Sequence, residues 1–202
     1  MTEADRRHWE GRYTSGDAPI QARPNRWLAR QASFVDALAA ARTADTAAAS
    51  RPRALDIACG ASGTLAWLAR RGWQVTGVDI SPTALALARA QLSEGGLLAQ
   101  AVLVQADLDA WRPAADSCDL LTCFNFLDRR LWPAMRLAVR PAGLIGLKTF
   151  HTGRLAARPD TNPAHLLEPG ELAALVAGWG WRVLAAESDA QVEAVLAQRV
   201  EA

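Results

Sequence analysis

The sequence has few of the residues that stabilise secreted or metal-binding proteins. Its 202 residues include three cysteines, an odd number, and no two of them form a C-x-x-C pair. The first ten residues do not resemble a charged-then-apolar leader, so a reduced, cytoplasmic protein is expected. The three histidines lie far apart and match no metal-ligand spacing, so no metal is expected.

Long apolar runs and clusters of basic residues are also missing. No run is long enough to span a bilayer, so no membrane partner is expected. The net charge is +1, lysine occurs only as Lys148, and the arginines are scattered along the chain. Because nucleic-acid-binding proteins usually gather basic residues into a stripe or patch, no nucleic-acid partner is expected.

The sequence does contain an alternation of short apolar runs and helical patterns. Half of the residues are hydrophobic, which at this length suits one α/β domain. Near-continuous apolar runs predict parallel strands buried on both faces at Ala54–Ala58, Gln74–Asp79, Ala101–Gln105, Asp119–Phe124 and Gly143–Thr149. Helical patterns between the runs, one capped by Ser81 with Pro82 at its first position, predict a doubly wound parallel sheet.

The two ends of the chain depart from this alternation. Residues 1–40 predict an N-terminal helical lid segment, and the small, Ala-rich stretch 41–53 predicts a flexible linker before the core at 54–202 of a single domain. At the other end, "WRVLAAES" and "QVEAVLAQRV" predict a terminal antiparallel hairpin. A final helix over Ala190–Arg199 is the alternative, because alanine and glutamate favour helices.

The stretch "ALDIACGASG" joins the first predicted strand to a helical pattern and allows three interpretations. A dinucleotide-binding G-x-G-x-x-G loop would need glycines at Ala58, Gly60 and Gly63, and the first of these is missing. Asp56 would also face an anionic pyrophosphate unfavourably. A plain strand-to-helix turn is the second interpretation, and a loop for a different cofactor is the third.

Carboxylates at the strand ends favour a cationic cofactor. Asp56, Asp79 and Asp107 suit S-adenosylmethionine (SAM), which carries a sulfonium and an ammonium group and has no phosphate. Gly60 allows close approach of the methionine part, and the following helix N-terminus favours its carboxylate. Asp79 can accept both hydroxyl hydrogens of a ribose, although it can instead cap the helix at Ser81. Asp107 and Leu108 suit the adenine amino group and ring, although Asp107 can also be an ordinary loop carboxylate.

From Ala54 to Arg182 the chain resembles class I SAM-dependent methyltransferases. "ALDIACGASGTLAWLARRGWQVTGVDIS", "QADLDAW" and "CDLLTCFNFLDRRLWPAMRLAVRPAGLIGLKTF" are similar to their successive motifs. The resemblance implies a Rossmann-like, mostly parallel seven-stranded sheet of order 3-2-1-4-5-7-6, with SAM as cofactor and S-adenosylhomocysteine (SAH) as product. The cofactor-binding residues that it implies are Asp56, Ala58, Gly60, Asp79, Ile80, Asp107, Leu108, Asn125, Phe126, Trp9 and Tyr13.

Short pieces at both ends are similar to the tellurite-resistance-type group of small-molecule methyltransferases. These pieces are "HWEGRY" and "NPAHLLEPGEL". Trp9 and Tyr13 lie at i and i+4, so they form either a lid over the cofactor, as the family implies, or one apolar face of a helix. The chain departs from the family loop at Ala58 and Ser62, where glycines are usual.

Residues after the fourth and fifth strands are candidates for substrate handling. His151 follows the fifth strand and is the candidate general base, although an exposed loop histidine is the alternative. The Pro-rich segment His151–Glu168 predicts a substrate lid. The predicted substrate-binding residues are Asp128, Arg129, Arg158 and Asn162.

The function that these observations predict is in-line methyl transfer from SAM to a small molecule, by a monomer or homodimer. A non-catalytic module that binds SAM or SAH on the same fold is the alternative. A nicotinamide-dependent oxidoreductase is disfavoured by the loop and by Asp56. The acceptor atom does not follow from the sequence.

Overall fold

A computed structural model describes residues 3–18, 22–44 and 51–200. The chain divides into two compact units, residues 1–112 and 113–202. Seven strands have the order β3-β2-β1-β4-β5-β7-β6, which confirms the predicted order and fold class. The two units are described in turn.

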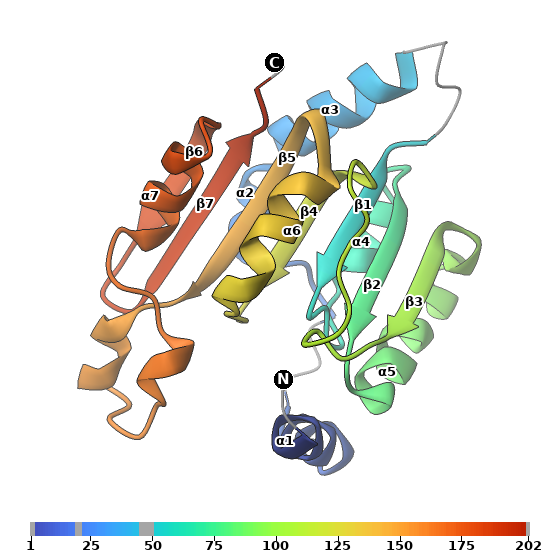
Figure 1. Ribbon diagram of the computed structural model, residues 1–202. Coiled ribbons are helices and arrows are strands. Elements are labelled where there is room, and N and C mark those ends of the chain that lie inside the picture. Colours follow the sequence, from blue (N-terminus) through green and yellow to red (C-terminus); the bar gives the residue numbers. More distant parts are fainter. Residues whose placement is uncertain (1–2, 19–21, 45–50, 201–202) are drawn as a thin grey trace. The chain divides into compact units, whose positions relative to one another are not determined.

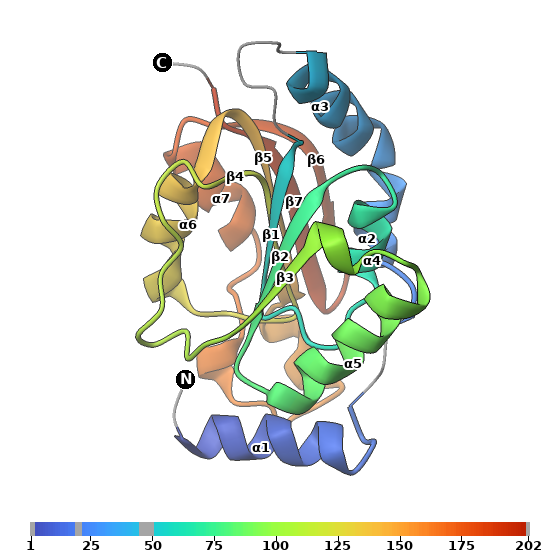
Figure 2. The ribbon, with the colours of Figure 1, turned by 90° about the vertical axis from the view of Figure 1, so that its right-hand side faces the viewer.

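The first unit is a parallel three-stranded sheet with helices on one face, and its N-terminal helix lies beyond the carboxyl ends of the strands (Figures 1 and 2). Its strands are β1 (Arg53–Ile57), β2 (Gln74–Asp79) and β3 (Ala101–Gln105), and β2 pairs with both of the others. Its helices are α1 (Glu3–Thr14), α2 (Arg26–Arg30), α3 (Ala32–Ala44), α4 (Thr64–Ala69) and α5 (Pro82–Glu94). A 3₁₀ turn, Leu98–Gln100, leads into β3.

The start of α5 forms as its sequence predicts. Ser81 is the N-cap, and its hydroxyl accepts a hydrogen bond from the Ala84 N–H at 3.0 Å. Pro82 occupies the first helical position, where a missing N–H costs no intrahelical bond. This capped start places α5 directly after Asp79, at the carboxyl end of β2.

The second unit combines a parallel strand pair with an antiparallel hairpin. Strand β4 (Cys118–Phe124) pairs in parallel with β5 (Val139–Phe150), and β7 (Val192–Gln198) pairs antiparallel with β5 and with β6 (Arg182–Ser188). The predicted terminal hairpin is therefore confirmed and the alternative final helix is wrong. Strand β7 lies between β5 and β6, and consecutive residues of its apolar run are buried, so both of its faces are covered.

The helices of the second unit are short. They are α6 (Trp132–Ala138), α7 (Glu171–Gly178) and the 3₁₀ turns η2 (Arg129–Leu131), η3 (Thr152–Ala156) and η4 (Pro163–His165). Helix α7 begins after Gly170, whose φ of +86° suits a residue without a side chain. Figure 1 shows α7 beside β6 and β7.

Strands β1 and β4 begin one residue before their predicted starts, and two other predicted boundaries differ more from the structure. The flexible linker predicted at 41–53 overlaps α3, which continues to Ala44 because its Ala-rich end favours a helix, and residues 45–50 lie outside the described residues. The fifth strand begins at Val139, four residues before the predicted Gly143. Residues 106–117 connect β3 to Cys118 through turns and extended chain.

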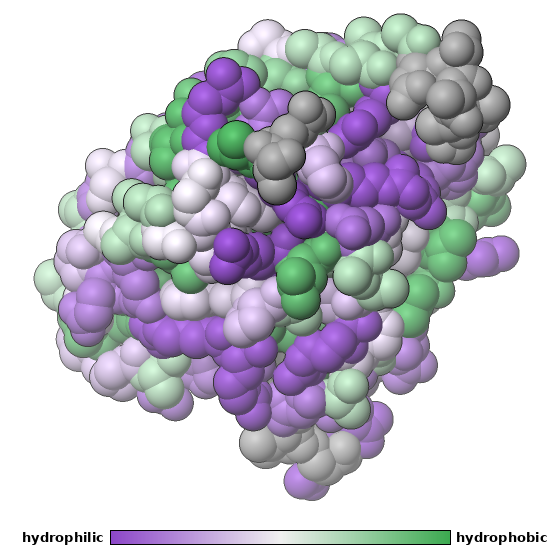
Figure 3. All heavy atoms as spheres, turned by 45° about the horizontal axis from the view of Figure 1, so that its top comes forward, coloured by the Kyte–Doolittle hydropathy of each residue, from purple (hydrophilic) through white to green (hydrophobic). Residues whose placement is uncertain are grey.

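Hydrophilic side chains cover much of the face drawn in Figure 3, and hydrophobic residues occur there as separate small groups. None of the helices in the described ranges is both long enough and apolar enough to cross a membrane.

Candidate cofactor and substrate sites

The loop after β1 adopts two left-handed backbone conformations. Ala58 has a φ of +52° and Gly60 a φ of +54°. Glycine reaches this region without strain, whereas a side chain makes it costly by about 1–2 kcal/mol. Ala58, where the family usually has glycine, therefore keeps the backbone shape that the missing glycine would take.

Asp79 links this loop to the start of α5. Its Oδ2 accepts a hydrogen bond from the Gly60 N–H at 2.8 Å, and its Oδ1 accepts one from the Ser81 N–H at 2.9 Å. The carboxylate is 8 % exposed, and burial raises its pKa although the backbone N–H groups of Ser81 and Gly60 act against the rise. Asp79 thus bonds the backbone at the start of α5, which is the capping role considered above, and the same side chain also hydrogen-bonds the glycine loop.

The structure places Tyr13 of α1 against the same loop. A Cβ built on Gly60 would lie 2.4 Å from the Tyr13 hydroxyl oxygen, so a side chain at this position would displace that hydroxyl. The hydroxyl accepts a hydrogen bond from the Ala61 N–H, and burial together with the charge of Asp79 raises its pKa. Tyr13, Gly60 and Asp79 are therefore brought together, as a lid over the loop requires.

The other aromatic candidate on α1 has different neighbours. The ring of Trp9 packs edge-on against His8, with centroids 5.5 Å apart, and the Arg12 guanidinium lies 5.3 Å from its centroid. Trp9 is half-buried. Its assignment to cofactor binding stays a prediction.

The second departure from the family loop, Ser62, has a local structural role. Its Oγ accepts from the Thr64 N–H at 3.1 Å and donates to the Thr64 hydroxyl at 2.9 Å, at the start of α4. Gly63 permits a close crossing, because a Cβ there would lie 2.7 Å from the backbone of Ala22. The serine therefore bonds the first turn of the helix, and the glycine beside it makes room for the chain.

Asp56 and Cys59 lie inside this unit. Asp56 on β1 is 2 % exposed, and Cys59 is buried. Burial and the charges of Asp56 and Asp79 raise the pKa of the Cys59 thiol well above its usual value. A thiol in this setting stays protonated, so Cys59 is a small core residue and not a nucleophile.

The candidates near the end of β3 divide between core and surface. Leu108 is fully buried, as is Ile80 after β2. Asp107 is exposed, and its Oδ1 accepts from the Asp109 N–H at 2.9 Å in a local turn. The predicted adenine contacts of Asp107 and Leu108 stay predictions.

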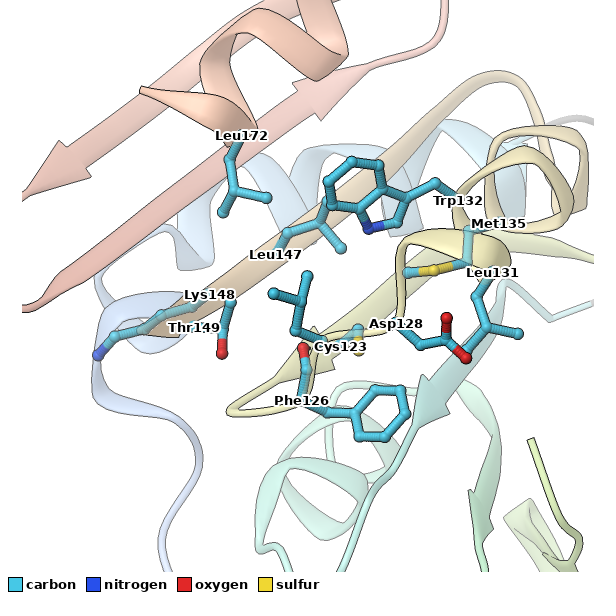
Figure 4. A pocket seen from close by; sticks show the side chains of 11 residues that line it. Cys123, Phe126, Asp128, Leu131, Trp132, Met135, Leu147, Lys148, Thr149 and Leu172 are labelled. Atoms are coloured by element: carbon cyan, nitrogen blue, oxygen red, sulfur yellow. Dashed lines mark hydrogen bonds between the residues drawn. The ribbon is translucent and has the colours of Figure 1, made fainter. Parts of the chain in front are cut away.

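The second unit contains a narrow pocket at the carboxyl ends of β4 and β5 (Figure 4). Its lining is mainly apolar with a few polar groups: Cys123, Phe126, Leu127, Asp128, Leu131, Trp132, Met135, Leu147, Lys148, Thr149 and Leu172. The free volume is about 10 Å³, which corresponds to about one water molecule. Phe126 and Asp128 therefore share a pocket that takes larger groups only after side chains move.

Asp128 and Arg129 are each held by another charged residue. The Asp128 carboxylate accepts from the Arg130 guanidinium at 2.9 and 2.8 Å and from its backbone N–H at 2.9 Å. Although burial raises the pKa of Asp128, these bonds outweigh it and lower the pKa overall. Arg129 forms a two-bond pair with Glu171, at 2.5 and 2.6 Å, and also donates to the Leu166 carbonyl at 3.0 Å.

His151 does not lie in an exposed loop. Its ring is 5 % exposed, and its Nδ1 accepts from the Gly153 N–H at 3.0 Å. Its Nε2 lies 2.9 Å from the Asp189 carbonyl oxygen and must carry the proton to make that bond. With both nitrogens bonded to backbone, the ring fixes the chain after β5, and its role as a general base stays a prediction.

The other predicted residues of this unit lie in turns. Asn125 follows β4 with a φ of +56°, a conformation that asparagine tolerates better than most residues, and it is exposed. Asn162 caps η4 by accepting from the Ala164 N–H at 3.0 Å, and Arg158 is exposed in the same long segment. That segment is pinned at its base by the pairing of His151 with Leu167.

Glu10 and Glu171 are the polar residues that the sequence analysis missed. Glu10 lies within "HWEGRY" but was not distinguished from a solvated helix face, and it bonds the start of α5. Glu171 lies in the first turn of α7, and its side chain also holds Arg129. No sequence pattern around Glu10 or Glu171 indicates these partners, which lie far away in the chain.

Comparisons with known proteins agree with this geometry. Residues 54–143 match the family model of a methyltransferase domain. The ubiquinone biosynthesis O-methyltransferase of Stutzerimonas stutzeri is 27% identical over 144 residues, which are 66% of this chain and 62% of that protein. The chain thus spans less than two thirds of the length of this relative.

Solved structures show the same fold. A SAM-dependent methyltransferase from Mesorhizobium loti has a TM-score of 0.58 at 20% identity, over 73% of this chain and 90% of that one. A structure described as the conversion of a disulfide bond into a thioacetal group during echinomycin biosynthesis has a TM-score of 0.64 at 22% identity, over 99% of this chain and 93% of that one.

The fold is therefore that of class I SAM-dependent methyltransferases. Residues 54–143 are similar to a methyltransferase domain, and these matches together support a SAM-dependent methyltransferase.

Proposed function

We propose that this protein transfers a methyl group from SAM to a small-molecule acceptor and releases SAH. The observation that carries the proposal is the link between Gly60 and Asp79: a buried carboxylate bonded to a side-chain-free turn at the ends of β1 and β2. In open α/β sheets, ligands bind beyond the carboxyl ends of the strands. The matched methyltransferase domain covers both residues.

The residues of the first unit fit SAM in chemistry. Asp56, Asp79 and Glu10 supply negative charge around the loop, which suits a cation and opposes a pyrophosphate. A carboxylate has about four acceptor sites, and the backbone N–H groups of Gly60, Ser81 and Ile80 occupy at most three of those on Asp79, so a ribose hydroxyl can still donate to it. The burial that raises the pKa of Asp79 also strengthens a bond to a cationic ligand.

When bound, SAM supplies a methyl group already activated by a sulfonium. The chain then has to bind, orient and exclude water. Asp79 would hold the ribose, Asp107 and Leu108 the adenine, and Tyr13 would cover the loop. Asn125 and Phe126 remain candidates for the cofactor, and Asp128, Arg129, Arg158 and Asn162 remain candidates for the acceptor.

A general base is needed only if the acceptor must lose a proton. His151 could serve only after its Nδ1 gives up the Gly153 N–H, because its Nε2 is the proton-bearing nitrogen in the bond to Asp189. The proposal therefore favours acceptors that are already deprotonated or that lose their proton to solvent. The motifs "HWEGRY" and "NPAHLLEPGEL" support a place among the tellurite-resistance-type small-molecule methyltransferases.

Calorimetric titration with SAM, SAH and NADH tests the proposal. We expect micromolar binding of SAM and SAH and none of NADH. A variant at an exposed acidic residue outside the loop, Asp160→Asn, is expected to bind equally well. Failure of both sulfur nucleotides to bind at sub-millimolar concentration would contradict the proposal.

A non-catalytic module that binds SAM or SAH is the second candidate. Two of the predicted substrate-binding residues already form ion pairs within the second unit, Asp128 with Arg130 and Arg129 with Glu171. These pairings favour the second candidate, because paired side chains are less available to a substrate. Micromolar SAM binding without methyl transfer to any of a panel of oxygen, nitrogen, sulfur and oxidised chalcogen acceptors would favour this alternative.

A further inference from the structure

A single carboxylate fastens the N-terminal helix α1 to the start of α5. Glu10 Oε2 accepts from the Ser81 hydroxyl at 2.5 Å and from the Thr83 N–H at 3.4 Å. Its Oε1 accepts from the Thr83 hydroxyl. In Figures 1 and 2 α1 lies beside α5 in both views.

The chemistry of this contact makes it a strong attachment for its size. A carboxylate at a helix N-terminus meets unpaired N–H groups and the positive end of the helix dipole. Glu10 also sits in the charge field of Arg6. Although burial raises the pKa of Glu10, the bonds from Ser81 and Thr83 outweigh it and lower that pKa, so Glu10 is ionised near neutrality.

The same face of α1 also reaches the glycine loop. Glu10 and Tyr13 are three residues apart, which places them one above the other on a helix. Glu10 therefore bonds α5 where Tyr13 covers Gly60 and accepts from the Ala61 N–H. Ser81 connects both contacts to Asp79, because its hydroxyl donates to Glu10 and its N–H donates to Asp79.

Glu10 and Tyr13 both contribute to holding α1 in this position. Much of the rest of the helix faces solvent: Arg6, Arg7, His8, Gly11 and Thr14 are exposed. A helix of 12 residues is marginal by itself in water and depends on its contacts with the rest of the protein. Loss of the Glu10 contact should therefore weaken the attachment of the helix measurably.

We propose that Glu10 is a positioning residue that fastens α1 over the Gly60–Ala61 turn, so that a bound cofactor leaves only when this attachment opens. The attachment itself rests on the bonds of Glu10 to Ser81 and Thr83. The identity of the retained ligand as SAM or SAH rests on the proposed function.

Hydrogen–deuterium exchange tests the attachment without any ligand. The variants are Glu10→Ala, Glu10→Gln, which keeps the length and one acceptor oxygen, and the control Glu94→Ala at the exposed far end of α5. Because alanine favours helices, faster exchange in Glu10→Ala cannot come from helix propensity. We expect α1 amides to exchange about tenfold faster in Glu10→Ala, an intermediate effect in Glu10→Gln, and no change in the control.

Release kinetics test the link to the cofactor. We expect SAH to dissociate about tenfold faster from Glu10→Ala, and the KM for SAM to rise while kcat at saturation is retained. Equal α1 exchange in Glu10→Ala and the wild type would overturn the attachment. Faster α1 exchange with an unchanged SAH dissociation rate would overturn its role in retention. If wild-type protein binds no SAH, the proposed function and the retention role fail together, whereas the exchange experiment still decides the attachment.

Discussion

Replacing Gly60 by alanine should cost stability through two separable effects. The backbone there has a φ of +54°, and a side chain in this region costs about 1–2 kcal/mol. The new Cβ would also lie 2.4 Å from the Tyr13 hydroxyl oxygen, so the hydroxyl must move and lose its bond from the Ala61 N–H. Loss of such a bond costs about 1 kcal/mol, which gives about 2–3 kcal/mol in all.

A double-mutant cycle with Tyr13→Phe separates the two effects. Without the hydroxyl, the nearest ring atom to the new Cβ is Cζ at 3.5 Å, an ordinary contact. Gly60→Ala should then cost only the backbone part, about 1–2 kcal/mol, so the coupling energy should be about 1 kcal/mol. The matched control is Gly72→Ala, where φ is +87° and a Cβ meets nothing within 4 Å.

Urea unfolding followed by circular dichroism measures these free energies. The control Gly72→Ala should show no coupling with Tyr13→Phe, because the two sites share no contact. An equal cost of Gly60→Ala in both backgrounds would refute the placement of Tyr13 on the loop. A cost near zero in the Tyr13→Phe background would refute the left-handed backbone at Gly60.

Three further predictions concern the loop, the ligand and the second unit. Ala58→Gly should stabilise the protein by about 0.5–1 kcal/mol in urea unfolding, because Ala58 holds a φ of +52°; destabilisation would contradict this. Asp79→Ala should weaken SAM binding in calorimetry by about 1.5–3 kcal/mol, and an unchanged affinity would rule out its ribose contact. The bond from Arg129 lowers the pKa of Glu171 below 4.5 in the folded protein. The ion pair therefore contributes to the free energy of unfolding above pH 4.5, and this contribution is lost as the pH falls through the folded-state pKa. In Glu171→Gln, the free energy of unfolding should accordingly fall less steeply with decreasing pH below 4.5. An unchanged slope of unfolding free energy against pH below 4.5 would contradict that assignment, although partial exposure of the pair keeps the effect small.

The fold was predictable because its signals are local. The strand runs, the Ser81–Pro82 helix start and the hairpin around residues 189–191 each depend on residues close together in the chain. The position of the candidate cofactor loop could be predicted from the strand ends, since parallel strands place their carboxyl ends along one edge of the sheet. Where the prediction was wrong at a boundary, as at α3, tertiary structure and Ala propensity extended the element.

The long-range contacts were not predictable in the same way. Glu10 bonds Ser81 at a separation of 71 residues, and His151 bonds the Asp189 carbonyl at a separation of 38. A single acid on a polar helix has the same appearance in the sequence whether it faces solvent or another helix. The sequence therefore located the candidate cofactor loop but not the residue that fastens a helix over it, and it found His151 without its two backbone partners.

The two departures at the loop show how one family pattern can be kept by different residues. Ala58 retains the left-handed backbone that a glycine usually provides, at a cost that Ala58→Gly measures. Ser62 uses its hydroxyl to bond the first turn of α4, while Gly63 takes over the close approach by admitting the backbone of Ala22. Neither change places a side chain at Gly60, and the bond from Gly60 to Asp79 is intact. Since the candidate cofactor site depends on that turn and that carboxylate, the missing glycines alter the strain and stability of the loop rather than the groups it presents to a ligand.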